Sequence, residues 1–360
     1  MFRPVESSLK KLILPITAAL AALPILLASA AAPAKDLARA ATFVVSTQQA
    51  DGGFGGSGAG QTMDAIYALR AAGIDPATVM KGGKSPADFL KANAAAAVKP
   101  AAAAKAALGA RALGLDPRNV NGTNLIANIT AGYDAARGEY AGDAFSQSIA
   151  MLGLSCTGNA LPSGAIVALR KAQIADGGWG FGSDSDADTT GIALQALVAS
   201  GAGASDGAVV KAVAYLKKTQ GTDGGWGFDP AESNTSSTAF VVQALIAAGE
   251  DVDGATYRKG TVGPMAYLLS QQVADGSFKG FDAAFATNQV LPAIAGRTFC
   301  NAADTPIAPI AAQPAPRPAA PLPPNTGNGR AIAGDSPLTV AGAFVLLAGA
   351  ISLGAARKRR

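Results

Sequence analysis

Apolar positions along the central part of the chain recur with helical spacing. Leu37, Ala41 and Val44 share one face of the segment 35–49, and Gly or Pro stands at many segment boundaries. Alternating apolar and polar runs typical of strands are nearly absent. The pattern predicts twelve helices, over residues 35–49, 62–72, from 86 onward, 100–114, 123–135, 144–156, 163–175, 189–199, 206–220, 237–248, 264–274 and 283–295, with Pro292 expected to shorten the last.

A Gly-rich turn with one aromatic residue joins the two helices of a pair. Clear copies run from Gln173 to Trp179 and from Gln220 to Trp226, and weaker ones from Gln48 to Phe54 and from Gln272 to Phe278. Asp176 and Asp223 are 47 residues apart, and Asp223 and Asp275 are 52 apart. Such periods are typical of helix-pair repeats, so the twelve helices form six pairs. Period alone leaves an open superhelix and a closed ring as alternatives.

The composition of this turn favours a structural role over ligand binding. Glycines permit backbone angles that other residues resist, and the aromatic residue provides a large apolar anchor between helices. The Gln amide can serve unpaired groups at helix ends as both donor and acceptor. We therefore interpret the turn as a clamp between successive helix pairs.

The same residues resemble the QW motif of the squalene-cyclase and prenyltransferase repeat family, in which Gln is joined to an aromatic residue through Gly. The resemblance covers most of residues 35–297. It implies an all-α (α/α)6 toroid, in which the second helix of each pair lines a central cavity. We expect this domain to span residues 34–301.

Three acidic residues, Asp184, Asp186 and Asp188, precede one of the expected inner helices. Squalene–hopene-type cyclases have Asp-x-Asp-Asp-Thr-Ala at a comparable place, where one Asp protonates the substrate. Asp186 and Asp188 match its first two acids, whereas Thr189 replaces the third, which weakens the case for a coupled strong acid. Helix capping explains the same residues and is favoured. Cation binding by the three carboxylates is a third interpretation, although the glycine turn and bidentate Glu of a calcium loop are missing.

Several other chemistries are excluded by residue types. The chain has no His, so the Asp-Cys-His zinc site of protein prenyltransferase subunits and any Ser-His-Asp triad are ruled out. No phosphate-binding loop is present. Neither Cys156 nor Cys300 is followed by the Glu-Gln of a thioester domain, and the two can either form a disulfide or stay buried as free thiols. We expect no cofactor and no metal.

Both ends of the chain carry targeting patterns. Residues 1–30 have Lys10 and Lys11 before an apolar run, which predicts a signal peptide. Residues 302–336 form a Pro-rich linker, 337–356 an apolar span and 357–360 a basic cytoplasmic tail. The linker sequence before Thr326 and Gly327 resembles a sortase sorting signal, with Pro323 departing from it. We expect an exported protein held at the cell surface by the membrane or cell wall, with a sortase as candidate partner.

The charge distribution argues against nucleic acid as a partner. The formal charge is +4, but the first 30 and last four residues together contribute +6, which leaves −2 between them. The expected inner helices also carry few aromatic residues to stabilise cations, namely Tyr67, Phe145, Phe240 and Phe285. The sequence therefore favours a non-catalytic ligand-binding or interaction module, with an apolar small molecule as candidate ligand. A squalene-type terpene cyclase and a cobalamin-binding protein of the intrinsic-factor type are the alternatives that the resemblance implies.

Overall fold

The computed structural model describes residues 34–55 and 58–307. The predicted leader, most of the linker with Thr326 and Gly327, the apolar span and the basic tail lie outside the described residues. Within the described ranges the chain forms α1 (Ala34–Ser46), α2 (Ala59–Ala71), α3 (Pro86–Asn93), α4 (Pro100–Ala112), α5 (Leu125–Ala131), α6 (Ala144–Ser155), α7 (Ser163–Lys171), α8 (Ala187–Ala199), α9 (Gly207–Thr219), α10 (Thr235–Ala247), α11 (Pro264–Ser270) and α12 (Ala283–Ile294). None of the helices described is long and apolar enough to cross a membrane.

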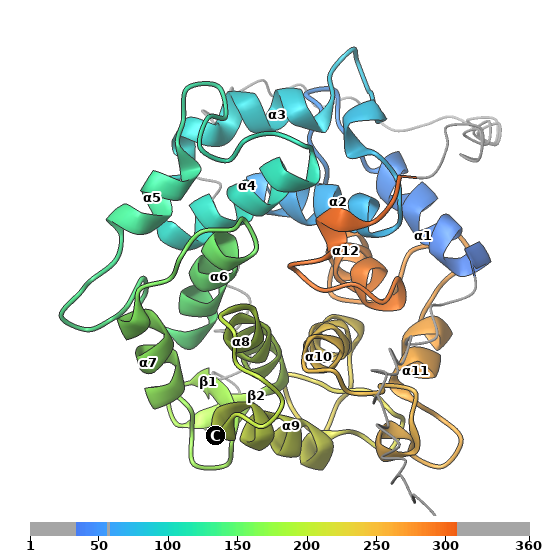
Figure 1. The fold of residues 1–360 in the computed structure, drawn as a ribbon. Coiled ribbons are helices and arrows are strands. Elements are labelled where there is room, and N and C mark those ends of the chain that lie inside the picture. Colours follow the sequence, from blue (N-terminus) through green and yellow to red (C-terminus); the bar gives the residue numbers. More distant parts are fainter. Residues whose placement is uncertain (1–33, 56–57, 308–360) are drawn as a thin grey trace, which may run out of the picture.

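The helices form a closed ring with two layers (Figure 1). The even-numbered helices α2 to α12 make the inner layer, each in contact with the next, and α12 contacts α2 to complete the circle. The odd-numbered helices lie outside; α5, for example, packs on both α4 and α6. The prediction of an all-α (α/α)6 toroid is confirmed, and the closed ring is chosen over the open superhelix.

The first helix completes the ring by docking on the last repeat. α1 packs against α12 as well as α2. Gln272 Nε2 donates to the carbonyl oxygen of Asp36 at 2.9 Å, and Arg39 Nη2 donates to that of Val273 at 2.8 Å. The closure is therefore a specific hydrogen-bonded junction.

Small residues let the inner helices approach closely. A Cβ at Gly153 of α6 would lie 2.4 Å from the Ala104 Cβ of α4, and one at Gly109 would lie 2.5 Å from the Met63 sulfur of α2. Neither position can accept a side chain without moving its neighbour. The Ala-rich composition thus serves tight packing between buried helices.

Two local features differ from the sequence prediction. Pro292 does not shorten α12, which continues to Ile294. Pro292 lies in its final turn and removes one N–H from the helix without ending it. A small hairpin of β1 (Trp179–Phe181) and β2 (Asp184–Asp186) was not predicted, because strands of three residues are too short to show alternation.

After α12 the chain turns back over one end of the ring, as the orange segment in Figure 1 shows. We call residues 296–307 the closing segment. Its short helix η4 (Ala302–Asp304) packs on α2 and α4, so ordered structure extends beyond residue 301. Cys300 forms a disulfide with Cys156 at the end of α6, which settles the alternative between paired and free thiols.

Candidate functional site

The Gln of each Gly-rich turn bonds a carbonyl of its own turn and a carbonyl of the next repeat. Gln173 Nε2 donates to the Gly177 carbonyl at 2.8 Å and to the Ala208 carbonyl in α9 at 2.9 Å. The other three Gln residues make the same two kinds of bond, Gln220 with Gly224 and Tyr257, Gln272 with Gly276 and Asp36, and Gln48 with Gly52 and Val79. The amide nitrogens therefore link each turn to the following repeat.

The aromatic residue of each turn is buried between helices. The Trp179 indole N–H donates to the Leu169 carbonyl in α7 at 2.8 Å, and its backbone N–H donates to Thr190 Oγ1 in α8 at 2.9 Å. Trp226 repeats both bonds with Leu216 and Thr238, while Phe54 and Phe278 keep the backbone bond with Thr62 and Thr287. The aromatic side chains contact protein and present no ligand surface.

The acidic stretch is divided by the hairpin that leads into α8. Asp184 lies opposite Phe181 and is exposed, whereas Asp186 lies opposite Trp179 and is 4% exposed. Asp186 caps α8, since its Oδ1 accepts the Thr189 N–H at 2.7 Å and its Oδ2 accepts the Thr189 hydroxyl at 2.9 Å. The structure thus places Asp186 and Asp188 together and leaves Asp184 at the surface.

Both inward carboxyls have raised pKa values. Burial raises the pKa of Asp186 to about 6, although the hydrogen bonds from Thr189 act to lower it. Burial raises the pKa of Asp188 to about 7, the nearby Asp186 charge adds to the increase, and the Ser237 hydroxyl of α10 lowers it. Asp188 Oδ1 is buried without a hydrogen-bond partner.

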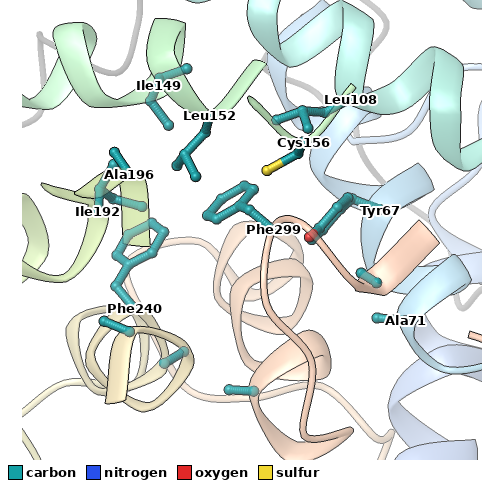
Figure 2. Close-up of a cluster of buried hydrophobic side chains, with 14 of the residues drawn as sticks. Tyr67, Ala71, Leu108, Ile149, Leu152, Cys156, Ile192, Ala196, Phe240 and Phe299 are labelled. Atoms are coloured by element: carbon teal, nitrogen blue, oxygen red, sulfur yellow. The ribbon is translucent and has the colours of Figure 1, made fainter. Parts of the chain in front are cut away.

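Capping accounts for Asp186 but not for Asp188. In the next repeat Asn234 caps α10 in the same way, accepting the Ser237 N–H at 2.9 Å, so an acid is not needed for this task. Asp188 is in the first turn of α8, one and two turns before Ile192 and Ala196, which face the ring interior in Figure 2. A carboxyl at the apolar interior is the feature that could move a proton.

The interior itself is apolar at the end covered by the closing segment. Figure 2 shows Phe299 pointing inward among residues of several inner helices, including Leu152, Leu108 and Tyr67. The Phe299 and Tyr67 rings stack with centroids 5.1 Å apart. A pocket of about 240 Å³ remains beside this segment, lined by Leu152, Gln195, Val198, Ala199, Ile246, Ala247, Thr298, Cys300 and Asn301.

Sequence reasoning missed one buried ion pair. Asp64 of α2 and Lys105 of α4 lie 2.8 Å apart on neighbouring inner helices. Burial raises the Asp64 pKa, and Lys105 opposes this. The only signal was a charged residue in the middle of each of two Ala-rich helices, each of which also has an Arg in its last turn. In the described part of the chain no group of three or more His, Cys, Asp or Glu is arranged to hold a metal ion.

Comparisons with known proteins agree with this architecture. Residues 165–290 match the family model of the squalene-hopene cyclase C-terminal domain, and residues 14–91 match that of the prenyltransferase alpha-alpha toroid domain. No curated protein matches the sequence significantly. The two family matches support a terpenoid cyclase-like family.

Solved structures of similar fold include the type II terpene cyclase MstE from Scytonema. Its apo form is 15% identical, with a TM-score of 0.53 over 72% of this chain and 97% of that one. A variant of MstE in complex with geranylgeranyl dihydroxybenzoate, its substrate, is 15% identical, with a TM-score of 0.54 over 76% of this chain and 97% of that one. Another apo variant reaches 0.56 at 16% identity, over 73% and 96%. At these identities the likeness establishes the fold.

Proposed function

We propose that the chain is a non-catalytic interaction module held at the cell surface, which works through the outside of its ring. The observation that supports the proposal is the closing segment, whose Phe299 lies among side chains of several inner helices at one end of the ring. Phe299 is only 7% exposed.

The closing segment is fastened at several points. The Tyr67 hydroxyl donates to the Thr298 carbonyl, and Arg111 Nη1 donates to the Cys300 carbonyl at 2.6 Å. The Phe299 N–H donates to Gln195 Oε1 at 3.3 Å, and the disulfide adds a covalent tie to α6. A prenyl chain or a corrinoid entering from this end would have to displace all of these contacts.

Surface attachment rests on the sequence. The leader at residues 1–30, the apolar run at 337–356 and the sorting-like motif at Thr326 and Gly327 together favour export and anchoring. Intact cells treated with protease should lose the ring domain. A loss of mass after Thr326 would identify sortase as the partner, whereas a full-length C-terminus in the membrane fraction would identify the span as the anchor.

The non-catalytic assignment is tested by incubating the purified full chain with squalene and with geranylgeranyl diphosphate. We expect no cyclic product by gas chromatography. A product that forms with the wild type, is lost in Asp188→Asn and persists in Asp251→Asn would overturn the assignment. Asp251 is an exposed acid on the loop after α10 and serves as the matched control.

Terpene cyclisation is the second candidate, favoured by Asp188. Its unpartnered Oδ1 and raised pKa would keep a proton on the carboxyl near neutral pH, as protonation of an alkene requires. Asp186 would act on Asp188 by its charge, with Thr189 in place of the third acid. This route needs the closing segment to move. The double variant Cys156→Ser/Cys300→Ser should therefore be assayed in parallel, with a product there supporting cyclisation.

A further inference from the structure

Three phenylalanines are exposed at matching places in successive repeats. Phe181 and Phe228 each follow a buried Trp by two residues, and Phe281 follows the buried Phe278 by three. Their exposed fractions are 38%, 39% and 97%. The buried aromatic of each turn makes the packing contacts, so these second aromatics are not needed to join the helices.

All three lie at one end of the ring. They lie in the turns that lead into α8, α10 and α12, three consecutive inner helices that contact one another in order. The closing segment follows α12 and therefore lies at the opposite end, where the inner helices finish. We call the three turns at 173–188, 220–236 and 272–284 the Phe rim.

The Phe rim is strongly acidic. Its three turns contain nine Asp or Glu residues and one basic residue, Lys279, and seven of the acids remain at the rim once the inward Asp186 and Asp188 are set aside. Acids stand close to each aromatic, Asp184 opposite Phe181 in the hairpin, Asp229 beside Phe228 and Asp282 beside Phe281. Asp184 and Asp229 are exposed. An exposed ring next to a carboxylate offers a cation both a π face and an opposite charge.

We propose that the Phe rim binds an extended polycationic segment of a partner protein, rich in Arg and Lys. Repetition over three adjacent repeats suits a partner that runs along the ring, because each repeat can take one side chain in the same way. The proposal rests on the proposed function and names the chemistry of its partner. A neutral glycan or an anionic lipid surface would gain nothing from these acids, and the acids would repel the latter.

The probe is a fluorescent deca-arginine peptide, titrated into the full chain and followed by anisotropy. We expect saturable binding that weakens as salt is raised from 50 to 300 mM. Phe181→Ala/Phe228→Ala/Phe281→Ala should weaken it by about tenfold, at a few-fold per ring. The control Val167→Ala/Val210→Ala removes exposed side chains from outer helices α7 and α9 and should leave affinity unchanged.

A second pair of variants separates local from general charge effects. Asp229→Asn/Glu232→Gln on the rim should weaken binding several-fold more than Asp116→Asn/Asp251→Asn, which removes two exposed acids elsewhere. The proposal would be overturned if both pairs of variants lost affinity equally, or if the triple Phe variant bound the peptide as the wild type does. It would also be overturned if the chain bound a glycan column but did not bind the peptide. The cyclase assay is independent of the titration. If the peptide does not bind and no cyclic product forms, only the proposal for the Phe rim is overturned. A cyclic product would remove the proposed function itself.

Discussion

At the scale of single residues, Asp186 and Asp188 show how two neighbouring acids acquire different roles. Asp186 uses both oxygens on Thr189 and completes a helix start. Asp188 is the second residue of α8, and its buried Oδ1 has no hydrogen-bond partner. A carboxylate in that position costs stability unless it takes up a proton.

This difference predicts a pH dependence of folding. A carboxyl whose pKa rises from 3.8 to about 7 on folding stabilises the fold in its protonated form, and that contribution is lost as pH rises from about 4 through 7. Asp188→Asn should therefore raise the free energy of unfolding at pH 8 by up to about 4 kcal/mol relative to the wild type, with little gain at pH 4. Urea unfolding at the two pH values measures the gain. Asp184→Asn, at an exposed position, should show no such difference, and a flat profile for both variants would contradict the assignment.

Gln272 allows the clamp to be tested at the ring junction. Gln272→Ala removes donors to the Gly276 and Asp36 carbonyls and should lower the free energy of unfolding by about 1–3 kcal/mol. The adjacent Gln271 is the control, because its amide bonds only the neighbouring Ser270 hydroxyl at 2.9 Å. Thermal unfolding of the two variants should differ clearly. Equal effects would show that the Gln272 bonds add nothing to ring closure.

At the scale of elements, the features that could be predicted from the sequence are those formed by residues close together along the chain. The turns around Trp179 and Trp226 were found because Gln, Gly and aromatic residues lie within a few positions and repeat. The helix positions were found for the same reason, although α5, α7 and α11 each end four residues before their predicted ends.

The closing segment could not be predicted, because its contacts are long-range. Phe299 meets Gln195 across 104 residues, and Tyr67 meets Thr298 across 231. No local pattern marks either pair, and the Asp64–Lys105 pair joins two separate helices in the same way. The candidate acids were therefore found from their spacing, whereas Phe299, which fills the interior at the other end of the ring, was not.

At the scale of the whole molecule, the disulfide is the strongest single constraint on the closing segment. It bridges 144 residues, so it removes much freedom from the unfolded chain. Cys156→Ser/Cys300→Ser should lower the free energy of unfolding by about 4 kcal/mol. Denaturant unfolding of the oxidised wild type and of this variant measures the difference.

The position of the disulfide leads to a second prediction, which distinguishes a role in holding the closing segment from general stabilisation by a cross-link. Without it, Phe299 and its neighbours should become accessible, so the variant should bind an apolar dye that the wild type excludes. Phe299→Ala with the disulfide intact is the control, because it empties the space without freeing the segment. If the double Ser variant is as stable as the wild type and excludes the dye, the hydrogen bonds alone hold the segment.

The junction between α1 and α12 has a consequence for how the chain acquires its structure. Gln272 and Asp36 are 236 positions apart, so their bond can form only after nearly the whole domain has emerged. Contacts of such separation pay a large loop-closure entropy and slow the search for the native topology. Each earlier repeat can pack on its neighbour, whereas the first and last repeats each keep one side unpacked until they meet. The last kinetic step is therefore expected to be the meeting of the first and sixth pairs, and a chain stopped before α12 would expose the apolar side of α2 to aggregation.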